Sequence, residues 1–268
     1  MRKTLVLCLC LTTGAANAGA LQTYYNLNGN LNPVINNTGL AQPLQFRTGG
    51  SGGSSSGGAV NYTTETVGPV SKLVANFTAP QFFRAIHGIG KNGGGSYLNQ
   101  YAILMDVKIT NAGGWVSLYS TAAENGNDGD AFIRDTDSAL GTIGDYGGTF
   151  VRNQWNRVII SVDTLVPTMR IYLNGSFVND ITLDSGVDGR WSVYTLDDGD
   201  PGADWVDIFG DNDGDNGTGQ LSALAFFNGP LTDSDAAVLG GPGQPVPEPA
   251  TLLALGIGAL AIARRRRR

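Results

Sequence analysis

Residues 101–109, YAILMDVKI, decide the fold class. Apolar or aromatic side chains occupy every second position of this stretch, at Tyr101, Ile103, Met105, Val107 and Ile109. An alternation with a period of two is that of a β-strand with one buried face. The segment from Tyr97 to Thr110 therefore predicts a strand, and its regularity sets the pattern sought elsewhere in the chain.

Further strands are predicted downstream of this one. The stretch 170–178, RIYLNGSFV, places Asn174-Gly175 between two apolar runs, which predicts a tight hairpin because both turn residues tolerate a positive φ. Residues 155–163 read as another strand, and residues 203–209 and 220–227 as a late pair around an acidic loop. Residues 231–240 predict one short helix, with Thr232 or Asp233 as its cap and Gly240 as its end.

The rest of the chain is rich in turn residues, with 39 Gly among its 268 residues. Residues 21–46 predict a single edge strand, and the Gly/Ser tract at residues 49–58 predicts a flexible loop. Helix-forming residues are scarce, and one composition persists throughout, without the fixed repeat of a β-helix. These features predict an all-β protein, one antiparallel two-sheet sandwich.

The order of these segments resembles the laminin-G-like, concanavalin-A-like jelly-roll family. The shared run is a strand led by Trp155, the IYLNG hairpin, an Asp/Asn loop (IFGDNDGDNG), and a final strand followed by LTDSD and a short helix. Asp235 stands where the family usually has Glu. The resemblance covers roughly residues 60–240 and implies a jelly-roll sandwich, with calcium bound at its rim in many relatives.

The N-terminus predicts a signal peptide over residues 1–18. Arg2 and Lys3 form a basic start, residues 4–13 are apolar, and Ala16 and Ala18 flank an A-x-A cleavage site before Gly19. The two cysteines, at positions 8 and 10, lie inside this segment, so the mature chain needs neither disulfides nor a thiolate metal site.

Residues 19–245 carry 22 acidic and 10 basic residues, a net charge of −12. So acidic a surface excludes nucleic acid as a partner, since phosphate backbones are bound by clustered Lys and Arg. It is compatible with divalent cations and with neutral polymers.

Two motifs match catalytic or cofactor-binding patterns only by letter. The G-x-G-x-x-G at residues 88–93 precedes a strand instead of opening a helix, and the G-x-S-x-G at 53–57 lies in the Gly/Ser tract. His87 is the one histidine, so any imidazole-based site depends on it. Retaining glycosidases of this fold need two carboxylates facing one cleft, whereas Glu65 and Glu124 are isolated; we therefore expect a non-catalytic protein.

The best candidate metal site is the loop at 211–217, DNDGDNG. Asp211, Asp213 and Asp215 offer oxygen ligands at alternate positions, which suits Ca²⁺. The loop is not an EF-hand, because Asn216 takes the Gly position and Ser222 the position of the bidentate Glu. Ordinary hairpin loops have the same composition, so calcium stays one of two interpretations.

Two tryptophans are candidate sugar-binding residues. Trp191 and Trp205 flank acidic segments and are expected to be exposed, whereas Trp115 and Trp155 read as core or sheet residues. An exposed indole ring could stack on a sugar.

The C-terminal segment 246–268, VPEPATLLALGIGALAIARRRRR, predicts an address signal. Its apolar run, residues 250–263, would span about 21 Å as a helix, short of the roughly 30 Å hydrocarbon core of a membrane. The order of Val246, Pro247, Glu248, Pro249, one apolar run and the arginines Arg264, Arg265, Arg266, Arg267 and Arg268 resembles the PEP-CTERM sorting signal of Gram-negative bacteria. The resemblance implies recognition by an exosortase-type membrane protease and removal of the tail.

The sequence thus predicts a signal peptide (1–18), a strand and loop (19–58), a jelly-roll core (59–240), a Gly/Pro linker (241–245) and a sorting signal (246–268). We expect export across the inner membrane, a transient anchor there, and delivery to the cell surface or extracellular matrix. The expected role is binding of extracellular polysaccharide or another ligand. A glycoside hydrolase-like enzyme of the same fold and a purely structural matrix protein are the alternatives.

Overall fold

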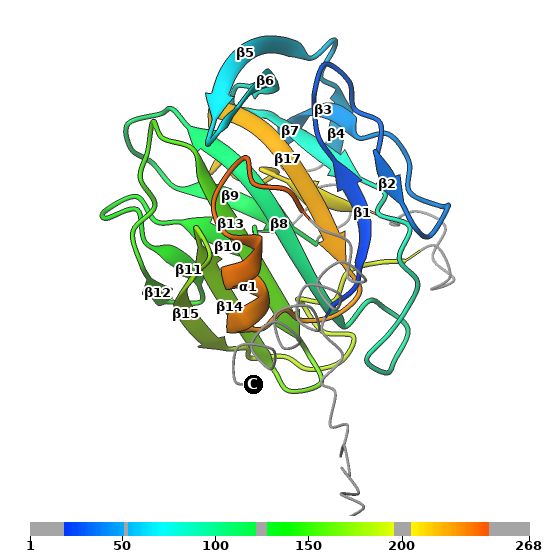
Figure 1. The fold of residues 1–268 in the computed structure, drawn as a ribbon. Coiled ribbons are helices and arrows are strands. Elements are labelled where there is room, and N and C mark those ends of the chain that lie inside the picture. Colours follow the sequence, from blue (N-terminus) through cyan, green and yellow to red (C-terminus); the bar gives the residue numbers. More distant parts are fainter. Residues whose placement is uncertain (1–18, 51–52, 122–127, 196–204, 247–268) are drawn as a thin grey trace, which may run out of the picture.

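The computed structural model describes residues 19–50, 53–121, 128–195 and 205–246. In these residues two antiparallel sheets lie face to face, with a single short helix on the outside of one of them (Figure 1). The predicted fold class, an all-β two-sheet jelly-roll sandwich, is confirmed.

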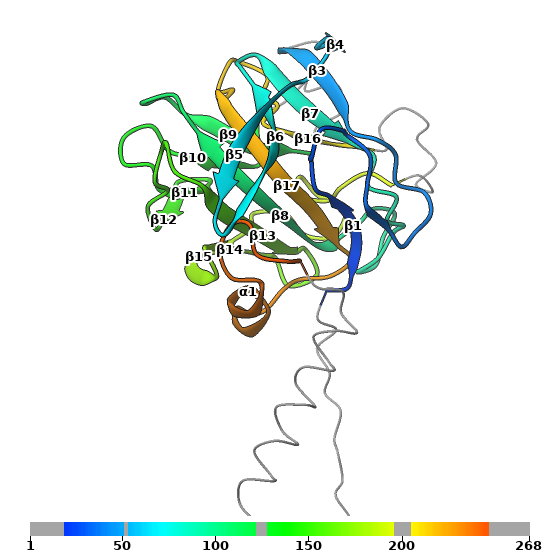
Figure 2. The same cartoon turned by 45° about the horizontal axis from the view of Figure 1, so that its top comes forward.

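Sheet A has nine strands, and its longest member, β8 (Gln100–Ile109), lies at its centre between β13 and β17. Its other strands are β15 (Ser176–Thr182), β14 (Thr168–Leu173), β13 (Asn156–Asp163), β17 (Gly219–Phe227), β1 (Leu21–Tyr25), β2 (Ile35–Asn36) and the hairpin of β5 (Asn61–Val67) and β6 (Val70–Phe77). The β5–β6 hairpin joins sheet A through the last residues of β6, which pair with β17, and from there it runs over the outer face of β17 and β8, where Glu65 pairs with Lys108 (Figure 2).

Sheet B has eight strands and faces the inner side of sheet A. In spatial order they are β12 (Asp145–Gly147), β11 (Leu140–Thr142), β10 (Ala131–Ile133), β9 (Val116–Ser120), β16 (Val206–Ile208), β7 (Gln81–Ala85), β3 (Gln45–Gly50) and β4 (Gly53–Ser56). The main hydrophobic core fills the space between the sheets and includes all five alternating residues of 101–109.

The predicted strand at 101–109 is buried on both faces, not on one. Ala102 and Leu104, on its outer side, belong to a second hydrophobic cluster with Tyr172, Leu231 and Leu239. This cluster forms because helix α1 (Asp233–Leu239) and the segment after it lie across the outer face of sheet A (Figure 1).

The local turn and cap predictions are confirmed. Thr232 caps α1 by accepting the Asp235 N–H, and the Asp235 side chain accepts the Thr232 N–H in return, so Asp235 performs the capping role of the usual Glu. Gly240, at φ +64°, ends the helix. Asn174 and Gly175, at φ +52° and +81°, form the two-residue turn between β14 and β15.

Two predicted elements are paired differently from the prediction. The segments 203–209 and 220–227 do not form a pair, because β16 belongs to sheet B and β17 to sheet A, so the acidic loop between them crosses from one sheet to the other. In the Gly/Ser tract, β4 pairs with β3 as an edge hairpin, with the Arg47 guanidinium donating to Ser54. Small residues suffice to form this hairpin because backbone hydrogen bonds hold the two strands together.

The N-terminal region also differs from the single edge strand that was expected. It supplies β1 and β2 to sheet A and β3 to sheet B. Its first described residue, Gly19, donates its N–H to the Pro230 carbonyl, and a Cβ there would lie only 2.1 Å from the Gly229 oxygen. The chain therefore enters sheet A in a position that only glycine fits.

The predicted Gly/Pro linker is docked on the domain. Residues 240–246, here called the strap, run from α1 across the outer face of sheet A and end at Val246, which is buried in the second hydrophobic cluster. Its glycine and proline residues allow the backbone of the strap to lie close to the sheet. The composition of the segment alone did not predict this docking.

Candidate functional site

The three aspartates predicted as ligands lie in one loop at the rim of the sandwich, residues 209–217, here called the aspartate loop. Phe209 anchors its start by stacking on Phe77 in the core at 4.4 Å. Asn216 closes its end by donating its side-chain amide to the Phe209 carbonyl at 2.8 Å. Ser117 donates its backbone N–H to the Asp215 carbonyl, which fixes the loop against β9.

Asp211 organises the interior of this loop. It is fully buried, and its carboxylate accepts the backbone N–H groups of Asp213 and Asp215 at 3.2 and 2.9 Å. The Gly129 N–H, from the neighbouring loop, donates to it at 3.1 Å. These bonds turn the chain so that a carboxylate oxygen from each of Asp211, Asp213 and Asp215 lies within 4.8 Å of the other two.

The three carboxylates have different acidities. Burial opposes ionisation of Asp211, but its hydrogen bonds prevail and lower its pKa. The hydrogen bond with Asp211 and the negative charge of that residue raise the pKa of Asp213. Burial, followed by repulsion from Asp211 and Asp213, raises the pKa of Asp215 to about 6. At neutral pH the aspartate loop therefore carries more negative charge than its own hydrogen bonds stabilise.

The geometry of the aspartate loop fits a calcium ion. Oxygens on opposite sides of Ca²⁺ lie about 4.6 to 5.2 Å apart, because each Ca–O distance is about 2.3 to 2.6 Å, and the 4.8 Å limit falls in this range. The buried Oδ1 of Asn216 accepts no hydrogen bond from the described residues and is a further oxygen in the same loop. Asp213 is exposed, which leaves room for water to complete the coordination.

The predicted exposure is wrong for Trp191, and Trp205 is less exposed than predicted. Trp191 is 0% exposed and donates its indole N–H to the Asp130 carbonyl, so it is a core residue and cannot stack on a sugar at the surface. Trp205 is half-buried, and the Arg84 guanidinium covers its ring at 4.2 Å. Arg84 is itself paired with buried Asp207 at 2.8 Å. Acidic flanking sequence did not indicate exposure, because Asp207 is paired with Arg84 in the interior and Asp188 accepts hydrogen bonds from the Ser96 and Tyr97 backbone.

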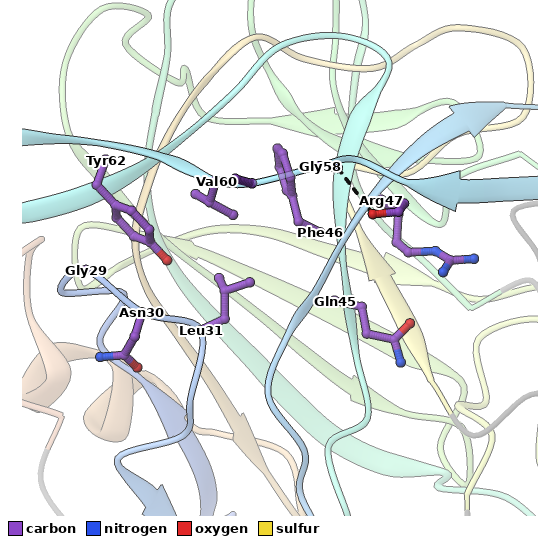
Figure 3. A pocket seen from close by; sticks show the side chains of 11 residues that line it. Gly29, Asn30, Leu31, Gln45, Phe46, Arg47, Gly58, Val60 and Tyr62 are labelled. Carbon is purple, nitrogen blue, oxygen red and sulfur yellow. Dashed lines mark hydrogen bonds between the residues drawn. The ribbon is translucent and has the colours of Figure 1, made fainter.

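A second site was not predicted from the sequence. It is a groove of about 520 Å³, here called the flap groove, between the loop before β2, strand β3 and the segment leading into β5 (Figure 3). Its lining residues are Gly29, Asn30, Leu31, Gln45, Phe46, Arg47, Ser56, Gly58, Ala59, Val60 and Tyr62.

The side chains that face one another across the flap groove are apolar or aromatic. Figure 3 shows Leu31 and Phe46 near its centre, Val60 above them, and Tyr62 beside Asn30 at one end. Arg47 is its one charged lining residue. Three segments far apart in the chain build this groove, so no local motif could have revealed it.

Other residues considered from the sequence have structural partners. His87 is buried; its Nδ1 accepts the Ile89 N–H, and its Nε2 lies 3.2 Å from the Tyr194 carbonyl. Glu65 pairs with Lys108 at 2.9 Å, and this hydrogen bond lowers the pKa of the Glu65 carboxyl. Glu124, the signal cleavage residues Ala16 and Ala18, and residues 247–268 lie outside the described part of the chain.

Comparison with protein families identifies the C-terminal segment. Residues 245–268 match the PEP-CTERM protein-sorting motif, which confirms the resemblance seen in the sequence and marks the chain as an exported protein sorted by an exosortase. Among the described residues, no helix has the length and apolar character needed to cross a membrane. A search of curated proteins found no match.

Comparison with solved structures identifies the architecture. Domain 4 of AbnA, a GH43 extracellular arabinanase from Geobacillus stearothermophilus solved in complex with arabinotriose, is similar with a TM-score of 0.53 and 19% identity, over 83% of this chain and 99% of that domain. The binding domain of botulinum neurotoxin DC, solved in complex with SialylT, has a TM-score of 0.47 and 13% identity, over 82% of this chain and 49% of that one. At these identities the first similarity establishes the jelly-roll fold.

Proposed function

We propose that this protein is a non-catalytic polysaccharide-binding protein of the cell surface or extracellular matrix of a Gram-negative bacterium. An exosortase-type protease removes its C-terminal tail after a transient stay in the inner membrane. The observation that carries the binding role is the flap groove, an open cavity on an exported domain with an aromatic ring at one end. The arabinotriose in the structure of the similar arabinanase domain supports a saccharide as the ligand class.

The chemistry of the flap groove suits a sugar chain. The C–H faces of a pyranose or furanose ring are apolar and pack against Tyr62, Leu31 and Val60. Hydroxyl groups at the ring edges meet the Asn30 amide and the backbone of the glycine-containing loops. Specific sites combine an apolar lining with a few placed polar groups in this way. The groove is open along its length, which suits an internal segment of a polymer.

Among the described residues, no acidic side chain lines this groove, which favours binding over hydrolysis. Glycoside hydrolysis uses two carboxyl groups about 5 to 9.5 Å apart, one of them with a raised pKa. Glu65 is held as a carboxylate by Lys108, and Asp207 is paired with Arg84, so neither is suited to act as a general acid. A hydrolase of the same fold is the alternative, and the assay below separates it from a binding protein.

We further propose that the aspartate loop binds Ca²⁺ through Asp211, Asp213 and Asp215. The ion would neutralise three converging carboxylates and fix the rim of the sandwich. The aspartate loop lies between β16 and β17, whereas the flap groove lies at β3. Because the two sites are separate, we assign a structural role to the ion and the recognition of the ligand to the groove.

The test is binding of the mature protein to a panel of polysaccharides that includes arabinan, by affinity electrophoresis and thermal melting. We expect at least one polysaccharide to bind, and Tyr62→Ala to weaken that binding at least tenfold, as an aromatic anchor does. Tyr146→Ala, at the opposite edge of sheet B, is the matched control and should bind normally. Release of reducing ends would establish the hydrolase, and failure of every polysaccharide to bind would favour a structural matrix protein.

A further inference from the structure

The docked strap lies directly before the sorting motif. Arg157, which is 0% exposed, donates to the Leu239 carbonyl at 2.5 Å and to the Gln244 carbonyl at 2.9 Å. One side chain therefore binds the chain both where helix α1 ends and near the end of the strap.

The acidic partner of Arg157 also holds the strap. Asp106 accepts two hydrogen bonds from Arg157, at 2.6 and 2.8 Å, and a third from the Gly243 N–H at 2.9 Å. The pair lies on the outer face of sheet A, on the adjacent strands β13 and β8. Lifting the strap would remove two of the hydrogen bonds that compensate two buried charges, those of Gln244 and Gly243, which favours the docked state.

Two glycines make this close contact possible. A Cβ on Gly243, at φ +75°, would lie 2.0 Å from the Val67 carbonyl oxygen. A Cβ on Gly68, in the turn between β5 and β6, would lie 2.1 Å from the Pro242 carbonyl oxygen. The strap and the β5–β6 turn therefore meet backbone to backbone, with no space for side chains.

Little free chain remains between this contact and the membrane segment. Val246 is buried at 8% exposure, and the apolar run of the sorting signal begins at Ala250. These four residue steps span at most about 14 Å when fully extended. Proline at positions 247 and 249 further limits the paths that this segment can take.

We propose that the strap is a gate on the sorting step: the protease takes the sorting signal only after residues 240–246 lift from sheet A. A protease binds several residues of its substrate in extended form, and the docked strap denies it the residues on the domain side of the motif. Cleavage of a folded protein proceeds from its opened state, so the rate follows the population of that state. This inference rests on the proposed removal of the tail by an exosortase.

The test follows tail removal in the full chain, expressed in a bacterium that carries an exosortase, by pulse-chase labelling and intact mass. Gly243→Ala and Gly68→Ala should loosen the strap and speed conversion to the mature form roughly tenfold. Gly241→Ala, in the same strap with open space at its Cβ, and Gly39→Ala, at φ +73° with equally open space, are the matched controls and should be cleaved at the original rate.

Hydrogen exchange of the purified proteins shows whether the strap itself has changed. The backbone amides at positions 243 and 244 should exchange faster in Gly243→Ala than in Gly241→Ala, while the core amides of β8 stay protected. Faster strap exchange together with faster cleavage supports the gate. Unchanged cleavage or unchanged strap exchange in both clash variants overturns it. A wild-type chain whose tail is never removed instead overturns the proposed sorting, and the gate with it.

Discussion

Asp106 and Asp211 are both buried carboxylates, yet the protein compensates their charges in different ways. Asp106 receives two bonds from Arg157 and one from the Gly243 backbone, so its charge is balanced by a basic side chain. Asp211 accepts three backbone N–H groups and lies beside Asp213 and Asp215, whose charges add to its own. The first arrangement closes a structural contact, whereas the second is the one at which we propose that Ca²⁺ binds.

The comparison also separates two uses of acidic residues in one chain. Where arginine meets aspartate, as at Arg157 and Arg84, the pair is inaccessible and joins segments distant in sequence. In the aspartate loop, the hydrogen bond and negative charge of Asp211 raise the pKa of Asp213, and burial with repulsion raises that of Asp215; perturbed titration is typical of binding sites. The five predictions below follow in order of expected size.

The largest effect is expected from Asp106→Asn. This change leaves Arg157 charged, buried and without its carboxylate, which should lower the free energy of unfolding by about 3 to 5 kcal/mol. Denaturant unfolding monitored by tryptophan fluorescence measures it. Asp137→Asn removes the partner of Arg134 in an exposed pair and should leave the free energy of unfolding nearly unchanged, because solvent screens such pairs. Equal costs for the two variants would contradict the distinction.

His87 provides a third case, a buried ionisable group with no charged partner among the hydrogen bonds of its ring. Burial lowers the pKa of His87 to about 4, below its unfolded value of 6.5. The stability that depends on neutral His87 is therefore complete above about pH 6.5 and is lost as the pH falls toward 4, by roughly 3 kcal/mol. NMR titration of the His87 ring, the one imidazole of the chain, separates its protonation from that of the carboxyl groups. A ring that titrates near 6.5 by NMR would refute the prediction.

Calcium should stabilise the protein through the aspartate loop. At a free Ca²⁺ concentration one hundred times the Kd, the gain is about 2.7 kcal/mol, which raises Tm by several degrees. Asp213→Asn should remove this gain, whereas Asp145→Asn, on edge strand β12, should keep it. Melting curves with Ca²⁺ and with chelator provide the measurement, and an identical Tm in both conditions would eliminate the calcium site.

When no calcium is present, the aspartate loop predicts a pH dependence of stability opposite to that of His87. Because the pKa of Asp215 is raised to about 6, its protonated form favours the folded state. Its contribution is complete below the unfolded pKa of about 3.8 and is lost as the pH rises through 6. In chelator at pH 7, Asp215→Asn should therefore raise Tm, and this gain should vanish near pH 4.

The smallest effect is expected at the cap of α1. Thr232→Ala removes the side-chain oxygen that accepts the Asp235 N–H and should cost about 1 kcal/mol. Ser234→Ala, at an exposed position inside the same first turn, is the control and should change the free energy of unfolding by no more than a few tenths of a kcal/mol. Because α1 ends at the Leu239 carbonyl that Arg157 binds, a cost near 4 kcal/mol would mean that the helix, not the ion pair, holds the outer face together.

The sequence predicted those features that depend on neighbouring residues. The alternation at 101–109, the Asn174-Gly175 turn and the Thr232 cap each follow from local backbone preferences, and the structure confirms them. The grouping of Asp211, Asp213 and Asp215 was also predicted, because alternate residues of one tight loop stay close together.

Features that depend on distant residues were not predictable in this way. The burial of Trp191 depends on Asp130, sixty-one residues away, and the docking of the strap depends on Arg157 and Asp106. The Gly/Pro composition of the strap is that of a linker, and only the close backbone contact with Val67 and Gly68 shows why glycine is needed there. The flap groove likewise exists only after three segments meet.

Leu21 and Val246, close to the two ends of the described chain, belong to the same hydrophobic cluster. A domain whose ends meet can be inserted into a larger protein as a self-contained unit, since the host chain enters and leaves at one place. The arabinanase domain with the similar fold is itself one domain of a longer enzyme. We therefore expect this sandwich to fold as a self-contained unit, and in this protein the segments flanking the unit are predicted to direct its export and its release.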